Sequence, residues 1–349
     1  MTILNGMILW FSILSLTNKK IATLISYLSI VVFATMIGLR DIYHGSDTPT
    51  YVNYFNEYTT LYNLFEKFQD KGDYLFFVFG WFVKQITPYP EVYIFILSFL
   101  SIVIFYVSYL KLFNDYSYQH KNILLYSSFF TSSILLIYGN VIRQGFSISL
   151  IVLAIYLFSI KRLKSVFFTL LCASLIHKAA FLFFIILPIV FMYNISTKKL
   201  LFTAGMSWIF MKINLLSMIV PENFFIIGSI LSGYANSDFN VDNLALKIIG
   251  LSISLIYFYF VTTKNKEYYF NKLFKIYLLL YSFIVISYPF GKFCERLILY
   301  DSILLPILFF MTIKIFKQKI FMIFSYLIAS LLYGMYVISH PAILSNIRY

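Results

Sequence analysis

Charged residues and cysteines are scarce in this chain of 349 residues. Asp, Glu, Lys and Arg make up only 12% of it, about half of their usual share in a soluble globular protein. The two cysteines, Cys172 and Cys294, form no CxxC pair and have no metal-ligand spacing, which argues against a disulfide framework, a zinc site or a haem site. Neither a Gly-rich phosphate-binding loop nor a Rossmann glycine fingerprint is present, so nucleotide hydrolysis is not the expected energy source.

Long apolar runs fill most of the chain. Hydrophobic residues are 61% and aromatic residues 21% of the sequence, and the mean hydropathy is +0.84. The alternating polar and apolar pattern of an outer-membrane barrel is missing. Since a spanning helix needs about 20 mostly apolar residues, we predict an all-α polytopic integral membrane protein with about twelve transmembrane helices. The candidate spans are roughly 1–16, 21–39, 91–111, 122–138, 144–160, 165–177, 179–195, 200–220, 244–263, 273–290, 295–313 and 320–340.

The basic residues set the expected orientation. The formal net charge is +13, but Lys and Arg stand in short clusters between apolar runs, which indicates membrane topology rather than nucleic-acid binding. All clusters face the cytoplasm only if the stretch 73–87 does not cross, and its short length and Lys84 favour a re-entrant or interfacial helix. Both termini and the loops 40–90 and 221–243 then lie outside. We expect one transmembrane domain over residues 1–349, with its first apolar run retained as a span.

The outer side also collects nearly all the acidic residues, while the cytoplasmic loops are short and basic. The external acids are Asp41, Asp47, Glu57, Glu66, Asp70, Asp73, Glu91, Glu222, Asp238, Asp242 and Glu295. This asymmetry places the chemistry on the outer face. No DxD-type pair stands on the external loops, so we predict no cofactor and no obligatory metal, although Asp238 and Asp242 keep the metal question open.

Four of the five arginines are expected on the outer side, where the positive-inside rule disfavours them. They are Arg40, Arg143, Arg296 and Arg348. The first three stand at the outer ends of hydrophobic helices, in GLRD, GNVIRQG and GKFCERLILYD. A guanidinium matches two phosphate oxygens and keeps its charge at any physiological pH, so three of them converging would form a diphosphate site. Separate anchoring of each one to phospholipid headgroups is the alternative.

Two further motifs carry candidate polar groups. In CASLIHKAAFLFF, His177 interrupts an apolar stretch at a predicted outer turn, where an imidazole can accept a proton or simply lie at the headgroups. In HGSDTPTYVNYF, Asp47 and Tyr51 are four apart and share one helical face. A carboxylate beside aromatic rings suits a sugar, whereas a plain N-cap before a helix with an early proline is the structural alternative for Asp47.

The C-terminal motif GKFCERLILYD places several polar groups at one helical start. Arg296 and Tyr300 share a face because they are four apart. Glu295 and Asp301 stand beside them. A helix with its own surface ion pairs is the competing interpretation of this group.

Taken in order, these motifs resemble a known family. GLRDIYHGSDTPTYVNYF, YGNVIRQGFSISL, LIHKAAFLF and CERLILY are similar to the ordered motifs of EpsG-type polysaccharide polymerases, which belong with the Wzy polymerases of lipopolysaccharide O-antigen and capsule. The resemblance runs over roughly residues 1–310. One loop reads GSDTPTY where GTD or GxD followed by Tyr is expected, a departure that leaves Asp47 and Tyr51 in place.

The resemblance implies a GT-C-type membrane glycosyltransferase of the bacterial plasma (inner) membrane, with its active site facing the periplasm or exterior. Family members transfer a growing glycan from undecaprenyl diphosphate to the non-reducing end of a lipid-linked repeat unit. The implied partners are undecaprenyl-diphosphate-linked oligosaccharides, the lipid bilayer and a polysaccharide co-polymerase that regulates chain length. The stretch 73–87 would form part of the wall where the isoprenoid enters.

The same resemblance suggests roles for the residues singled out above. The expected diphosphate-binding residues are Arg143, Arg296 and Arg40. His177 is the first choice of catalytic base for the acceptor hydroxyl and Asp47 the second. The expected sugar-binding residues are Tyr51, Glu295 and Tyr300.

Three other functions compete with a polymerase. A flippase or transporter of lipid-linked oligosaccharide predicts polar residues near mid-membrane on broken helices with related halves, whereas here the polar groups lie at the outer ends. An accessory membrane subunit would leave the arginines as anchors. An O-antigen ligase shares the diphosphate donor and differs only in its acceptor, and the motif order favours the polymerase.

Overall fold

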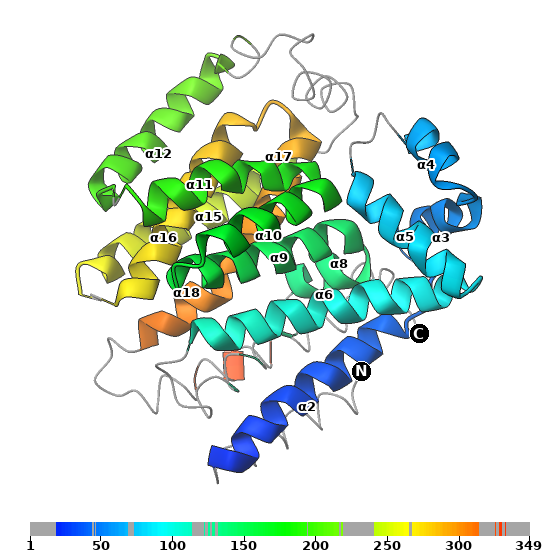
Figure 1. Cartoon of the computed structure of the whole chain (residues 1–349). Helices are drawn as coiled ribbons and strands as arrows, with labels where there is room; N and C mark the ends of the chain where they lie inside the picture. Colours follow the sequence, from blue (N-terminus) through cyan, green and yellow to red (C-terminus); the bar gives the residue numbers. More distant parts are fainter. Residues whose placement is uncertain are drawn as a thin grey trace. The chain divides into compact units, whose positions relative to one another are not determined.

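The structure, a computed structural model, describes most of the chain (Figure 1). The described residues are 19–113 except 44, 46 and 69–72; 122, 125, 128–129, 132–215 except 194; 218; 241–313 except 265–266; and the single positions 325, 328, 329 and 332. This part of the chain is helical and forms no strand. The predicted span 1–16, and most of the predicted span 320–340 and loop 221–243, lie outside it.

Two compact units make up the chain. The first unit contains residues up to Phe184 together with those from 320 onward, and the second unit contains Ile185–Lys319. The helices of the first unit are α2 (Lys19–Gly38), α3 (Thr48–Glu57), α4 (Leu61–Phe68), α5 (Tyr74–Ile86), α6 (Pro90–Leu112), α8 (Ser132–Gly139), α9 (Ile142–Ser159), α10 (Leu163–Ile176) and the 3-10 helix η2 (Lys178–Leu182). Those of the second unit are α12 (Thr197–Lys212), α15 (Val241–Thr262), α16 (Tyr268–Ile286), α17 (Gly291–Ser302) and α18 (Leu304–Thr312), while α11 (Phe183–Phe191) runs across the boundary.

The core of the first unit is a stack of long apolar helices, in which α6 packs against α2 and α9, and α9 packs against α10. Small hydroxyl side chains let these helices approach closely. Ser29, Ser101 and Ser149 are buried, and each donates a hydrogen bond to the backbone carbonyl four residues earlier on its own helix. These three buried hydroxyls are therefore satisfied without water.

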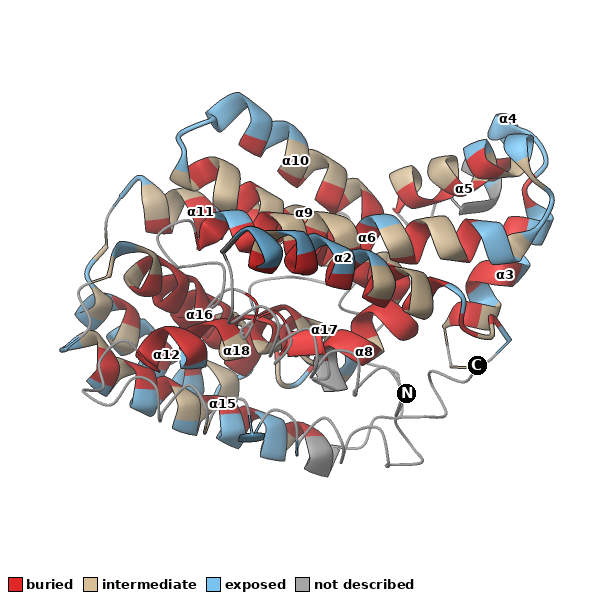
Figure 2. Ribbon diagram, turned by 90° about the horizontal axis from the view of Figure 1, so that it is seen from below, coloured by how far each residue is buried: buried red, intermediate tan, exposed pale blue. Residues whose placement is uncertain are grey.

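The second unit is built around α16, which packs against α12, α15, α17 and α18. Most residues of α16 are buried, so it is red over nearly its whole length in Figure 2. Lys272 is among them, and its ammonium donates to the carbonyl of Val190 at 2.6 Å near the end of α11. A cation at a helix C-terminus pairs with unsatisfied carbonyls and with the negative end of the helix dipole, which explains this buried lysine structurally.

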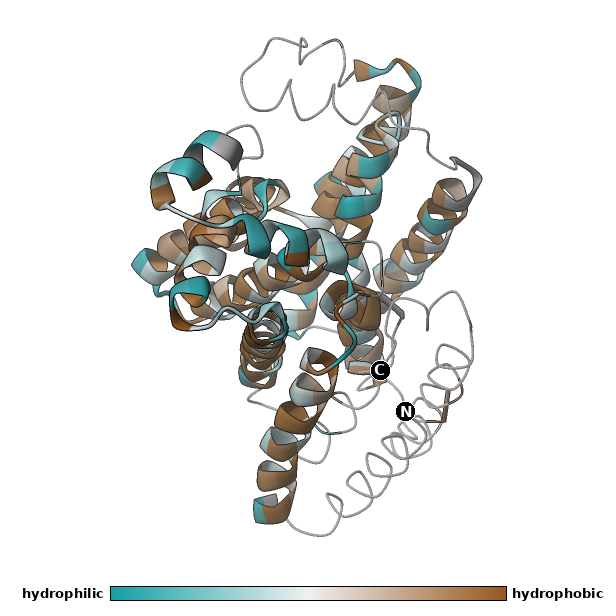
Figure 3. Ribbon diagram, turned by 90° about the vertical axis from the view of Figure 1, so that its right-hand side faces the viewer, coloured by the Kyte–Doolittle hydropathy of each residue, from teal (hydrophilic) through white to brown (hydrophobic). Residues whose placement is uncertain are grey.

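Five of the described helices are long and apolar enough to cross a membrane, by length and composition. They are Lys20–Gly38, Pro90–Leu112, Ile142–Ser159, Leu244–Thr262 and Tyr268–Ile286, and they coincide with five predicted spans. In Figure 3 hydrophobic residues cover the longer helices and hydrophilic ones gather on short helices. The helical and membrane character of the prediction is thus supported, whereas the count of twelve spans, the GT-C likeness and the single domain stay predictions.

The stretch 73–87 folds as predicted into one short helix. Helix α5 runs over Tyr74–Ile86, 13 residues, which span only about 20 Å at 1.5 Å per residue, less than the roughly 30 Å hydrocarbon core of a bilayer. It packs against α4, α6 and α10. Helix α5 is therefore packed against other helices of the first unit.

Candidate functional site

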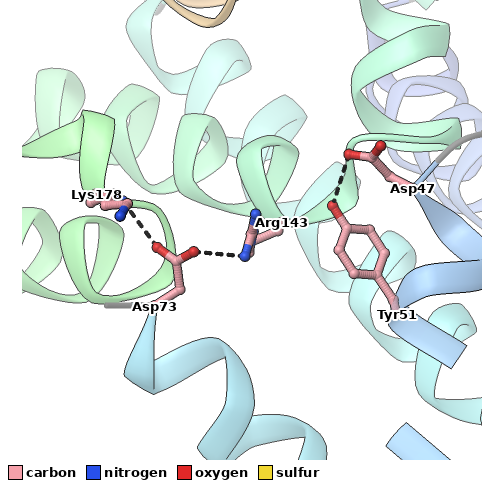
Figure 4. A network of polar contacts seen from close by, with 5 residues as sticks. All are labelled: Asp47, Tyr51, Asp73, Arg143 and Lys178. Carbon is pink, nitrogen blue, oxygen red and sulfur yellow. Dashed lines mark hydrogen bonds and ion pairs between the residues drawn. The ribbon is translucent and has the colours of Figure 1, made fainter. Parts of the chain in front are cut away.

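The first turn of α5 begins with a buried carboxylate, Asp73. Its backbone carbonyl accepts from the N–H groups of Phe76 and Phe77 and so starts the helix, but its side chain makes no capping hydrogen bond to α5. One carboxylate oxygen lies 2.6 Å from an amino nitrogen of Arg143. The other accepts from the backbone N–H of Lys178 at 3.2 Å. Asp73 therefore joins the beginnings of α5, α9 and η2, as Figure 4 shows.

Burial strengthens the attraction between Asp73 and Arg143, and it also makes an unpaired charge at either position costly. The side chains of Asp73 and Arg143 are 3% and 16% exposed, so little water screens their attraction. Arg143 is the second residue of α9, where the positive end of the helix dipole disfavours a cation and favours an anion. The Asp73 carboxylate offsets both the buried charge and the dipole. The start of α9 is thus arranged to hold negative groups.

The predicted pair Asp47 and Tyr51 lies at the start of α3, with the Tyr51 hydroxyl donating to the Asp47 carboxylate at 3.4 Å. Asp47 occupies the N-cap position, which was the structural alternative for it, but its side chain makes no capping hydrogen bond. Its backbone N–H donates to the Asn140 side-chain oxygen at 2.9 Å, and Thr48 donates to the carbonyl of Gly139. These contacts fasten α3 to the junction between α8 and α9, just before Arg143.

One aromatic ring connects the two pairs. Phe76 of α5 lies edge-on to Tyr51, with ring centroids 5.3 Å apart, and the Arg143 guanidinium carbon lies 5.8 Å from the centroid of the same Phe76 ring. Cation and ring attract each other at this distance. The first unit therefore gathers Asp47, Tyr51 and Arg143, three of the predicted site residues, around the first turn of α5.

His177 is connected to Asp73 through the next residue, Lys178. It ends α10, as the predicted turn requires, and its backbone carbonyl accepts from Ala180 in η2. The residue is 2% exposed, so the imidazole is buried rather than lying freely at a surface. Since Lys178 donates its backbone N–H to Asp73, the turn carrying His177 is tied to Asp73 as well.

Arg40 follows α2 and is 3% exposed. Its guanidinium donates to the carbonyl of Ile37 at 2.6 Å and to the hydroxyl of Ser98 at 3.0 Å. A cation in this position satisfies a carbonyl at the C-terminus of α2 and complements the dipole. These contacts give Arg40 a structural task, and its part in a diphosphate site stays a prediction.

The remaining predicted residues lie on α17, in the second unit. Glu295 pairs with Lys247 of α15 at 3.0 Å, with both side chains largely exposed, while Tyr300 is buried and Arg296 is half-buried. Each unit is described by itself, so the convergence of Arg296 with Arg143 stays a prediction. Within the described ranges no cluster of His, Cys, Asp and Glu has the makeup to hold a metal ion.

Sequence reasoning missed the role of Asp73 and of Asn140. Asp73 counted only as one of many external acids, although an acid directly before an apolar helix is a local signal for an N-terminal position. Neither its pairing with Arg143 nor the contact of Asn140 with Asp47 follows from spacing, because each joins segments far apart in the sequence.

Comparison with known proteins gives one match. The profile of the EpsG family matches residues 23–349. None of the curated proteins and none of the solved structures compared with the chain matches it.

Proposed function

Because the chain belongs to the EpsG family, we propose that it is a polysaccharide polymerase of the bacterial plasma membrane. Family membership suggests a polysaccharide-polymerase-like membrane protein. The proposal goes further: a membrane glycosyltransferase transfers a glycan from undecaprenyl diphosphate to the non-reducing end of a lipid-linked repeat unit on the outer face. Arg143 at the start of α9, against the Phe76 ring that also contacts Tyr51, is the observation that carries it.

The leaving group in this reaction is a diphosphate, so the reaction needs no nucleotide. Arg143 would neutralise the departing diphosphate, helped by the positive end of the α9 dipole. Arg296 and Arg40 are the further candidates for this task.

The other half of the reaction needs a base and a sugar site. The acceptor hydroxyl oxygen attacks the anomeric carbon of the donor glycan, the bond from that carbon to the diphosphate breaks, and the hydroxyl proton passes to the base. His177 is the first candidate for the base, and Asp47 the second. The sugar-binding candidates remain Tyr51, Glu295 and Tyr300, and a polysaccharide co-polymerase is the proposed protein partner.

The test compares two arginines of the first unit. Surface glycan from cells that lack the gene is run on a gel after complementation with wild type, Arg143→Ala, Arg143→Lys or Arg162→Ala, with membrane levels measured by immunoblot. Arg162 is exposed in the loop between α9 and α10 and serves as the matched control. We expect Arg143→Ala to lose the ladder of polymer lengths and Arg162→Ala to keep it. A normal ladder from Arg143→Ala at normal membrane level would refute the diphosphate role.

The strain lacking the gene separates the competing functions. Single repeat units on the cell surface indicate a missing polymerase. Absence of any surface repeat unit indicates a block before polymerisation and favours a flippase. Full-length polymer trapped on its lipid carrier indicates a ligase.

A further inference from the structure

The first turn of α5 holds the Arg143 guanidinium from two directions. Asp73 contacts one amino nitrogen at 2.6 Å, and Phe76, three residues later on the same helix face, presents its ring 5.8 Å from the guanidinium carbon. An ionic contact to one nitrogen and a ring near the guanidinium carbon together restrict the position of the guanidinium.

The second oxygen of the same carboxylate fixes a different element. It accepts the backbone N–H of Lys178, the residue after His177. The turn that carries the proposed base and the arginine that binds the proposed diphosphate are therefore attached to the two oxygens of one side chain. Asp73 is 2% exposed, so the link is shielded from competing water.

We infer that Asp73 is a positioning residue of the diphosphate site, which sets Arg143 and the His177 turn in one fixed arrangement. This inference rests on the proposed function. Asp73 acts through Arg143 and touches neither the donor nor the acceptor. The anion then meets a guanidinium that is already oriented, and less conformational freedom is lost on binding.

If Asp73 has only a structural role, its substitution should have a different effect. Such a pair contributes little to stability compared with well-packed apolar residues, and a purely structural Asp73 would affect folding independently of what Arg143 binds. A positioning Asp73 has no separate effect on binding once Arg143 is gone. The two roles therefore differ in the coupling between substitutions at the two positions.

The experiment measures binding of undecaprenyl diphosphate to the purified full-length protein in detergent, by native mass spectrometry, with undecaprenyl monophosphate as the comparison lipid. The variants are Asp73→Asn, Asp73→Glu, Arg143→Ala, the double variant Asp73→Asn with Arg143→Ala, and Glu91→Gln. Asn keeps an acceptor for the Lys178 N–H but loses the charge, and Glu keeps the charge. Glu91 is an exposed acid in the first turn of α6 and is the control.

We expect Arg143→Ala to weaken diphosphate binding by roughly 10- to 100-fold and Asp73→Asn by about 3- to 10-fold, as for loss of charge-assisted hydrogen bonds. The double variant should bind no more weakly than Arg143→Ala. Asp73→Glu should recover part of the affinity, and Glu91→Gln should bind like wild type. Phe76→Leu, which removes only the ring, should weaken binding by a smaller factor. If Asp73→Asn does not fold, Asp73→Glu provides the test, because its longer side chain shifts the carboxylate relative to Arg143; affinity equal to wild type would then contradict the positioning role.

The outcomes separate the two claims. If Arg143→Ala loses affinity while Asp73→Asn and Phe76→Leu bind like wild type, the positioning role is wrong and the diphosphate site stands. If the losses in the double variant add, Asp73 acts independently of Arg143 and the inference is equally refuted. If Arg143→Ala binds like wild type, the proposed diphosphate site itself fails.

Discussion

Close packing at the start of α9 gives a direct test of the site's geometry. Gly145 lies one turn inside α9, and a Cβ atom built there would stand 2.8 Å from the carbonyl oxygen of Ile137 and 2.9 Å from its side chain. Ordinary contacts between such atoms begin near 3.5 Å. An added methyl group must therefore push α8 and α9 apart by roughly half an ångström or more, because a backbone carbonyl cannot rotate away as a side chain does.

The expected magnitude comes from two opposing terms. Forcing an extra methyl group into a packed core costs about 1–3 kcal/mol, while replacing Gly by Ala within a helix gains about 0.5–1 kcal/mol. Gly250 of α15 offers the matched control, since a Cβ atom there meets nothing within 4 Å. The propensity term is common to both substitutions, so the difference between Gly145→Ala and Gly250→Ala isolates the clash, at about 1–3 kcal/mol.

Thermal unfolding of the purified protein in detergent, followed by size-exclusion chromatography after heating, measures this difference. Gly145→Ala should melt below wild type and Gly250→Ala at or above it. Because the same junction carries Asn140 and Arg143, the Gly145 variant should also produce a shorter glycan ladder. A Gly145→Ala protein that melts as high as Gly250→Ala would show that α8 and α9 do not approach as closely as described.

Three further predictions concern other parts of the molecule. Asn140→Ala removes the acceptor for the Asp47 N–H and should lower stability by about 1–3 kcal/mol; Asn140→Asp, which keeps an acceptor but buries a second carboxylate beside Asp47, should lower it at least as much in the same melting assay. Lys247→Ala breaks a pair with Glu295 whose side chains are 47% and 38% exposed, so it should change stability by less than about 1 kcal/mol and leave the melting temperature nearly unchanged. Burial raises the pKa of the Cys294 thiol from 9.0 to about 12. Because the folded state holds this proton while the unfolded state releases it, stability should fall as pH rises between these values. With the other cysteine replaced by serine, maleimide labelling at about pH 8 should be slow until the protein is unfolded in SDS.

Local patterns predicted several helix starts and ends, because capping and helix-breaking residues act on the backbone next to them. The predicted spans 179–195 and 295–313, by contrast, each fall on two shorter helices. Thr48-Pro49 after Asp47 predicted a helix start, and α3 begins at Thr48. The short apolar run 73–87 predicted a helix too short to span, and α5 covers Tyr74–Ile86. Arg143 was expected at the end of a hydrophobic helix and is the second residue of α9, and His177 was expected at a turn and directly follows α10; the outer side of both stays a prediction.

Local patterns could not predict contacts between residues that are far apart in the sequence. Asp73 and Arg143 belong to separate segments, which are brought together by the packing of α5 against α6 and α10, both of which also contact α9. The Asp47 carboxylate was weighed as a capping group or a sugar ligand, and the structure gives it the Tyr51 hydroxyl. In each case several partners of the right chemistry exist in the sequence, and tertiary packing selects one.

The position of Arg143 is unfavourable in three separate ways, which together argue for a ligand. It is an arginine on the side of the membrane predicted to disfavour cations, at the helix end where the dipole repels them, and its side chain is only 16% exposed. Asp73 offsets the last two, and buried ion pairs can often be replaced by apolar residues without loss of stability. The pair is explained more fully if a guanidinium must be held in place at the start of α9 to bind an anion. A polyprenyl diphosphate at the membrane interface is an anion of that kind, and its binding would use the favourable dipole that Arg143 by itself opposes.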